Sequence, residues 1–165
     1  MLHSLQKLSQ HAFLAAERLF NACFSERLNP LYYLGAITYF LLWIAIVTGL
    51  YLYAFFETSL AAAYPSVEAL THGQRYVGGV MRSLHRYSSD GLVLGMLLHL
   101  FRHFTFDHHR GFRWFSWISG VALLWLTTAS GINGYMLPWD RLAQFLVTAT
   151  TEWFDVLPVI GGSMT

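Results

Sequence analysis

The chain has 165 residues, of which 55% are hydrophobic and only 12% are charged. A water-soluble domain carries about 25% charged residues, so this composition excludes an ordinary soluble protein and favours one embedded in a membrane. The formal net charge of +1 gives no basis for binding nucleic acid or any other strongly charged partner.

The first 28 residues have the pattern of an amphipathic helix that lies on the membrane surface. Their apolar residues recur at helical spacing, at Leu5, Leu8, Ala12, Ala15, Leu19 and Cys23. The first long apolar run begins only at Leu31, and no short apolar segment with a small-residue cleavage site comes before it. We therefore expect that the chain has no cleaved signal peptide, and we assign residues 1–28 to a surface helix.

Two uncharged runs of 26 residues, 31–56 and 114–139, are long enough to cross a bilayer, since each forms ~39 Å of helix. Residues 77–106 lie between them and are equally rich in Leu, Met, Gly and Phe, but they include Arg82, His85, Arg86, Asp90, His99 and Arg102. Two spans alone would need a very long connection. A third transmembrane helix over 77–106, with its polar groups facing the bundle, is the simpler prediction.

Helical spacing returns after residue 140 and predicts a second surface helix over 141–156, with apolar residues at Leu142, Phe145, Leu146, Ala149 and Trp153. No linker, low-complexity tract or repeat divides the chain, so residues 1–165 are expected to form a single domain. The predicted fold is an all-α membrane protein with three transmembrane helices and amphipathic surface helices.

The distribution of basic residues predicts the orientation in the membrane. With three spans, one side carries Lys7, Arg18, Arg27, Arg102, Arg110 and Arg113, and the other carries Arg75, Arg82, Arg86 and Arg141. Basic residues are enriched on the inner side of membrane proteins. The excess of six over four therefore predicts that the N-terminus lies inside.

His85 and His99, both in the predicted middle span, are separated by 14 residues. On an α-helix this separation is ~21 Å along the axis and about 40° short of four turns, so both rings lie on one face at two membrane depths. Imidazole is a good axial ligand of haem iron, and two haems stacked across a bilayer need ligands at two such depths. Because Cys23 is the only cysteine, any metal must be held by histidine or carboxylate.

The flanking spans repeat this interval with two pairs of glycines, Gly35 with Gly49 and Gly120 with Gly134. If the helices alternate in direction, the inner level combines Gly35, His99 and Gly120, and the outer level combines Gly49, His85 and Gly134. A glycine has no Cβ atom, so a helix backbone can approach the edge of a haem closely there. The pattern predicts two haem sites, each with one histidine ligand.

Arginines bracket the two histidines and are candidates for pairing with haem propionates. Arg82 lies three residues before His85, and Arg102 lies three residues after His99. Arg86 could also pair with a propionate at the outer end. Each feature alone has a simpler explanation. Intramembrane histidines often bind a neighbour's carbonyl group, and terminal arginines often extend toward water. A surface metal site is a weaker alternative, formed by His99, His103, His108 and His109.

Four segments carry a recognisable pattern, namely Arg82-Ser83-Leu84-His85-Arg86-Tyr87, then His99 with Arg102, then Gly134-Tyr135-Met136-Leu137-Pro138-Trp139-Asp140, and finally Leu157-Pro158-Val159-Ile160-Gly161. Together they resemble the N-terminal half of cytochrome b, and most of all the short, split form called cytochrome b6. The resemblance extends from about residue 29 to the end of the sequence.

The resemblance implies half of a haem-binding transmembrane bundle in a quinol oxidoreductase of the cytochrome bc or b6f kind. In that family two b-type haems carry electrons from quinol across the membrane. His85 would match a ligand of the outer, low-potential haem, and His99 one of the inner, high-potential haem. An outer quinol pocket would include Tyr135, Met136, Pro138, Trp139, Phe145 and Leu146.

The resemblance also implies partners, because the family takes the second histidine of each haem from a fourth helix, beyond residue 165. We expect a partner chain that carries this helix, a Rieske-type iron–sulfur protein, a c-type cytochrome, membrane lipid and a dimeric complex. The membrane would be a bacterial inner membrane or a thylakoid. The chain would be a subunit of a quinol–cytochrome c or quinol–plastocyanin oxidoreductase, inactive alone.

Two departures from the family pattern affect these expectations. Cytochrome b6 holds a further haem covalently through a cysteine, and Tyr33 stands at the corresponding position here, so no covalent haem is expected. Ala45 stands where many members of the family have glutamine. Two other functions stay compatible with the residues: a structural membrane anchor without complete haem sites, and a haem-bearing anchor of a different respiratory oxidoreductase. Haem content distinguishes the structural anchor from the electron carrier.

Overall fold

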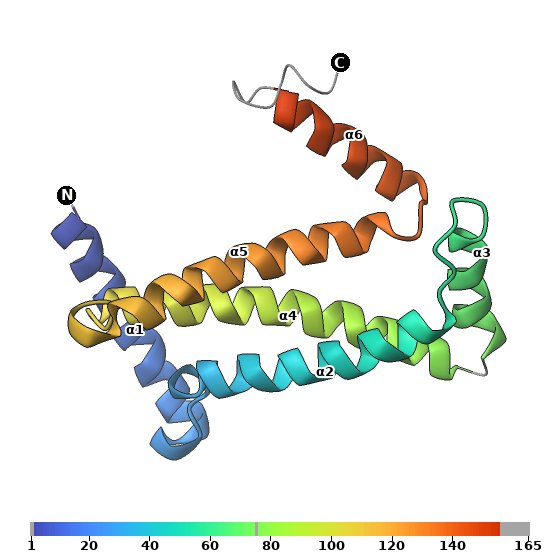
Figure 1. The fold of residues 1–165 in the computed structure, drawn as a ribbon. Coiled ribbons are helices and arrows are strands. Elements are labelled where there is room, and N and C mark those ends of the chain that lie inside the picture. Colours follow the sequence, from blue (N-terminus) through green and yellow to red (C-terminus); the bar gives the residue numbers. More distant parts are fainter. Residues whose placement is uncertain (1, 75, 156–165) are drawn as a thin grey trace. The chain divides into compact units, whose positions relative to one another are not determined.

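The computed structural model describes residues 2–74 and 76–155, and every element of regular structure in these ranges is helical (Figure 1). The long helices are α1 (Leu2–Phe24), α2 (Leu34–Phe55), α4 (Val77–Thr105), α5 (Trp114–Met136) and α6 (Arg141–Asp155). Each coincides with a helix predicted from the sequence, within a few residues. Val156, the predicted end of the last helix, and the family-like segment 157–161 lie outside the described residues.

Proline chemistry explains why two helices are shorter than predicted. Pro30 opens a short 3₁₀ helix, η2 (Pro30–Tyr32), whose preceding residue Asn29 accepts a hydrogen bond from the Leu31 amide at 2.9 Å, so α2 begins only at Leu34. At the other end, α5 stops at Met136 because a proline at 138 has no N–H group to donate and disfavours helical geometry in the residue before it.

The connection between α2 and α4 contains two short elements that the sequence did not predict. These are α3 (Ala63–Glu68) and the π-helical turn η3 (Ala69–Gly73). Two further 3₁₀ turns, η1 (Glu26–Leu28) and η4 (Gly111–Arg113), precede α2 and α5. The chain therefore uses short helical turns at the ends of its long helices.

Two helical segments of the described chain, Leu34–Phe55 and Gly111–Met136, are long and apolar enough to cross a membrane. Large apolar side chains on their surfaces are half or more exposed, including Trp43, Leu50, Trp125 and Leu126. So much exposed apolar surface is typical of a protein that faces lipid or partner helices. α4 has 29 residues and is long enough to span, but its charged residues lower its hydropathy, and it does not meet the same test.

The chain divides into two compact units, residues 1–48 with 84–128 (unit 1) and residues 49–83 with 129–165 (unit 2). In unit 1, α4 contacts α2 through two glycines. A Cβ atom added at Gly95 would lie 2.6 Å from Thr38 Cγ2, and one added at Gly91 would lie 3.3 Å from Leu41 Cδ1. The absence of these two side chains lets the helix backbones approach each other closely.

Helix α1 packs against the C-terminal end of α4 within unit 1 (Figure 1). Gln10 Nε2 donates to the Thr105 carbonyl oxygen at 3.0 Å, and the Thr105 hydroxyl group donates to Ser9 Oγ at 3.1 Å. The rings of Phe13 and Phe101 lie 5.9 Å apart. Hydrogen bonds and aromatic contacts therefore fix α1 to this end of α4.

In unit 2, the first turn of α4 packs tightly against η3. A Cβ atom added at Gly78 would lie 2.0 Å from the Leu70 carbonyl oxygen, so only glycine fits there. Tyr51 donates from its hydroxyl group to Gln74 Oε1 at 2.5 Å, which ties the end of α2 to the same connection. Close backbone packing and this hydrogen bond hold the connection in place.

Candidate functional site

The imidazole of His85 is held by residues in the second half of α2. Its Nδ1 atom lies 3.0 Å from the Ala45 carbonyl oxygen and 3.1 Å from Thr48 Oγ1. The Thr48 hydroxyl group itself donates a hydrogen bond to the Ile44 carbonyl oxygen at 2.6 Å. Thr48 is buried, with 2% of its surface exposed, so water does not compete for these contacts.

These contacts determine which ring nitrogen of His85 carries the proton. A carbonyl oxygen has no proton to donate, so Nδ1 must be the donor to Ala45, and the Thr48 oxygen can accept from the same N–H group. In the neutral ring the lone pair is then on Nε2. No described residue forms a hydrogen bond with that nitrogen. His85 therefore offers a free Nε2 with its other nitrogen oriented by a backbone carbonyl, as iron-ligating histidines do.

His99 lies next to Gly35, as the spacing of the sequence predicted for the inner level. A Cβ atom added at Gly35 would lie 3.0 Å from His99 Cε1 and 3.5 Å from Nε2, so the ring occupies the space that a side chain would fill. His99 is half-buried, and its ring centroid lies 4.4 Å from that of His103. The contact between α2 and α4 thus includes the second candidate ligand.

The other predicted glycines have different surroundings. Gly120 faces Leu100, because a Cβ atom there would lie 2.9 Å from Leu100 Cδ2, and the Trp117 indole donates to the Leu100 carbonyl oxygen at 3.2 Å. A Cβ atom added at Gly134 would meet no described atom within 4 Å, so open space adjoins this part of α5. Gly49 is half-buried in α2.

The two arginines predicted beside the histidines bind partners within the chain. Arg82 Nη1 donates to Thr71 Oγ1 at 3.0 Å. Arg102 donates to Glu17 Oε1 from Nε at 3.1 Å and from Nη2 at 2.8 Å, which forms an ion pair between α4 and α1. Arg86 is exposed. The sequence contained no signal that Glu17, distant in the chain, would be the partner of Arg102.

The corner between α5 and α6 borders a hollow of about 310 Å³. Of the residues predicted for a quinol pocket, Met136 and Trp139 line it, whereas Tyr135, Pro138, Phe145 and Leu146 do not. The remaining lining comes from the end of α5 and the residue after it, and from the segment between α2 and the start of α3, namely Phe56, Thr58, Ser59, Leu60, Ala63, Asn133 and Leu137. The segment between α2 and α3 was missed because its loop-like composition gives no sign of what it faces.

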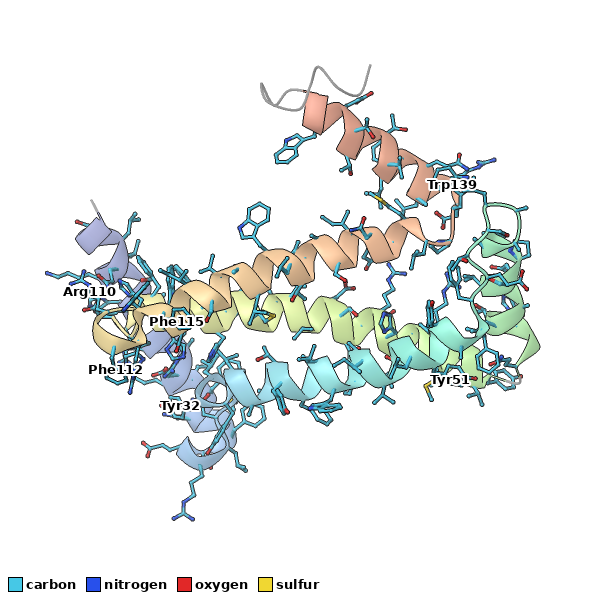
Figure 2. All side chains as sticks on the ribbon, in the orientation of Figure 1. Tyr32, Tyr51, Arg110, Phe112, Phe115 and Trp139 are labelled. Atoms are coloured by element: carbon cyan, nitrogen blue, oxygen red, sulfur yellow. The ribbon has the colours of Figure 1, made fainter. Side chains whose placement is uncertain are left out.

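Trp139 stands at this corner with an unusual backbone (Figure 2). Its φ of 53° is in the left-handed region, which costs a bulky side chain about 1–2 kcal/mol. The next residue, Asp140, accepts a hydrogen bond from the Ala143 amide at 2.8 Å and so caps the start of α6. The cap and the strained turn together fix the direction in which α6 leaves α5.

The described residues contain no group of three or more His, Cys, Asp or Glu side chains arranged to hold a metal ion. The rings of His103 and His108 are close, with centroids 5.3 Å apart, but no third such side chain in the described part of the chain completes a group with them. The surface metal site considered from the sequence is therefore not formed. The half-buried His109 ring packs instead on Phe104, with centroids 5.0 Å apart.

Comparison with known proteins gives one consistent family. The family model described as Cytochrome b/b6/petB matches residues 19–165. Cytochrome b6 of Porphyra purpurea and cytochrome b6 of Pyropia yezoensis are each 35% identical to this chain over 136 residues, and cytochrome b6 of Gracilaria tenuistipitata var. liui is 32% identical. The match covers 82% of this chain and 63% of each relative, so the chain spans less than two thirds of their length.

Proposed function

The chain belongs to the cytochrome b/b6 family, a family of haem-binding transmembrane electron carriers, and we propose that it is one half of a dihaem cytochrome in a quinol oxidoreductase. Quinol would donate electrons near the outer surface, and the two b haems would carry them across the bilayer. The chain would act only within a complex, in which residues 1–165 would supply one histidine to each haem.

The hydrogen bond from His85 Nδ1 to the Ala45 carbonyl oxygen is the observation that carries this proposal. A histidine used only for packing could equally bind a carbonyl group, but this contact occupies one nitrogen and leaves Nε2 free. A histidine that ligates a metal has this same arrangement, since the backbone acceptor fixes the tautomer and raises the basicity of the ligating nitrogen. This arrangement supports the proposal that His85 is a ligand of the haem iron.

The residues around the two histidines have separate roles in the proposal. His85 and His99 would be ligands of the haem irons. Gly49 and Gly134 would leave room for haem edges, Gly35 would leave room for the ring of the ligand His99, and Gly120 would admit a haem edge once the Leu100 side chain moves aside. Arg82, Arg86 and Arg102 would neutralise propionate groups. Haem iron bound in this way supplies a reversible one-electron centre. The protein orients the ligands, keeps water away and sets the surrounding charge.

Residues 1–165 would form one membrane domain with three transmembrane helices, in which α4 is the middle span between α2 and α5. Polar residues in a membrane helix are expected where they face a bundle and bind a cofactor, so the low hydropathy of α4 agrees with this role. α1 and α6 would lie at the two membrane surfaces, and the excess of basic residues would place the N-terminus inside.

The partners of the proposed complex follow from the family to which the chain belongs. A second chain would provide the fourth helix and the remaining histidines, and a Rieske-type iron–sulfur protein and a c-type cytochrome would accept electrons. Quinol would bind beside Met136 and Trp139, with Tyr135, Pro138, Phe145 and Leu146 approaching once a partner chain is present. With Tyr33 at the position of the cysteine, no covalent haem would form. The complex would be a dimer in a bacterial inner membrane or a thylakoid.

The experiment that tests the proposal is a reduced-minus-oxidised absorption spectrum of the complex purified from its native membrane, with haem counted per chain. We expect two b-type haems per chain and no haem that remains covalently attached after acid–acetone extraction. We also expect that quinol reduces both haems. A complex without b-type haem would make the chain a membrane scaffold, and a haem that quinol does not reduce would assign it to another oxidoreductase.

A further inference from the structure

Arg102 is held in a defined position by α1, and its surroundings explain how. Two of its nitrogens, Nε and Nη2, donate to the same carboxylate oxygen of Glu17. The guanidinium carbon lies 5.1 Å from the centre of the Phe106 ring and 5.6 Å from that of Tyr32, which Figure 2 labels beside α1. Aromatic faces and a carboxylate thus surround the charge.

Burial makes this ion pair different from an ordinary surface contact. The side chain of Glu17 is 10% exposed and that of Arg102 is 22% exposed, so water screens their attraction only weakly. Asn29 is fully buried, and its Nδ2 donates to the Glu17 carbonyl oxygen at 3.1 Å, which fixes the backbone at this turn of α1. The backbone of Glu17 is therefore held in place independently of Arg102.

The contact with Glu17 leaves part of the guanidinium group unused. Arginine has five N–H donors in a planar fork, and Glu17 takes those of Nε and one of Nη2. Among the described residues, none accepts a hydrogen bond from Nη1. Arg102 can therefore bind a second anion while Glu17 holds it, and it lies one helical turn from His99.

We propose that Glu17 is a positioning residue for the inner haem: it holds Arg102 toward the propionate and its negative charge lowers the midpoint potential of that haem alone. This inference rests on the proposed function. It assigns to the surface helix α1 a role in electron transfer, because a carboxylate near a haem disfavours the extra electron of the reduced state. The ion pair between Glu17 and Arg102 would at the same time stabilise the packing of α1 on α4.

The test uses the purified complex with Glu17→Gln, which removes the charge but keeps the length of the side chain. Redox titration followed by haem absorption should show a higher midpoint potential for the haem that is lost in His99→Ala and an unchanged potential for the other. Hydrogen exchange of the α1 amides should become roughly tenfold faster, because a charge-assisted hydrogen bond contributes about that factor. Glu17→Asp, which keeps the charge, should leave both potentials close to those of the unaltered complex.

Glu26→Gln is the matched control, since Glu26 is exposed, lies just beyond the end of α1 and forms no hydrogen bond or ion pair among the described residues. It removes the same charge and should change neither potential nor exchange. If the unaltered complex has two haems and the potential of the inner haem is the same in Glu17→Gln as in Glu26→Gln, this inference is overturned. The proposed function would then still stand. A Glu17→Asp complex shifted as far as Glu17→Gln would also overturn this inference. An unaltered complex without haem would overturn both.

Discussion

The Nδ1 atom of His85 lies 3.0 Å from the carbonyl oxygen of Ala45, so a backbone group of α2 determines the tautomer of a histidine on α4. Such an acceptor cannot be removed by mutation of a side chain. The Thr48 hydroxyl group, 3.1 Å from the same nitrogen, is the part of the arrangement that can be changed. The first prediction therefore concerns Thr48.

Thr48→Val removes the hydroxyl oxygen and keeps the shape of the side chain. His85 then has one acceptor in place of two, and we expect the affinity for the haem at His85 to fall roughly 10-fold or more, as losses of such supporting contacts do. Thr48→Ser keeps the oxygen and should retain the haem. Haem retention during detergent extraction, followed by absorption, measures the difference. Equal retention in the two variants would show that Thr48 does not support His85.

Gly35→Ala introduces a Cβ atom 3.0 Å from His99 Cε1, so the ring must move by a few tenths of an ångström. We expect this variant to lose the haem at His99 or to bind it with a changed spectrum. Alanine is a better helix former than glycine by about 0.5–1 kcal/mol, so a loss of haem would not reflect a weaker α2. Absorption at low temperature resolves the two haems and provides the measurement.

Gly131→Ala is the control for that substitution. A Cβ atom at Gly131 would meet nothing within 4 Å, and the residue lies within α5. Both haems should remain at full occupancy with unchanged spectra. If Gly35→Ala behaved in the same way, the close approach of Gly35 to His99 would have no role in haem binding.

Gly78→Ala tests the packing of unit 2 without reference to haem. Its Cβ atom would lie 2.0 Å from the Leu70 carbonyl oxygen, and a backbone atom cannot move aside as a flexible side chain does. We expect a loss of about 1–3 kcal/mol in the free energy of unfolding, the usual cost of overpacking. Gly73→Ala, where the added atom meets nothing within 4 Å, should be neutral. Thermal unfolding in detergent, followed by circular dichroism, compares the two variants, and equal midpoints would contradict the packing seen here.

The long helices could be predicted from the sequence because their signals are local. The uncharged run 31–56 and the spaced apolar residues of 141–156 each contain the evidence for a helix within themselves. α3 (Ala63–Glu68) could not be predicted in this way, since six residues give too few periods to detect. Pro65, in its first turn, looks like a helix breaker, although a proline there lacks only an N–H group that the helix does not use.

The surroundings of the candidate ligands depend on contacts between distant residues. Glu17 is 85 residues from Arg102, and Ala45 is 40 residues from His85, so no spacing rule relates them. The contact of Gly35 with His99 was predicted from equal intervals on two helices, because antiparallel neighbours with the same interval meet at the same levels. Gly120 shows the limit of that argument, since Leu100 fills the space that it faces.

Replacement of each histidine by alanine in the whole complex tests the central claim most directly. With haem counted per chain from the reduced-minus-oxidised spectrum, we predict that His85→Ala and His99→Ala each lose one of two b-type haems, and that the lost haem differs between them. His103→Ala is the control, because this histidine lies beside His99 on α4 with no assigned ligand role, and it should retain both haems. Two haems in both His85→Ala and His99→Ala would contradict the account and leave this chain without a part in haem ligation.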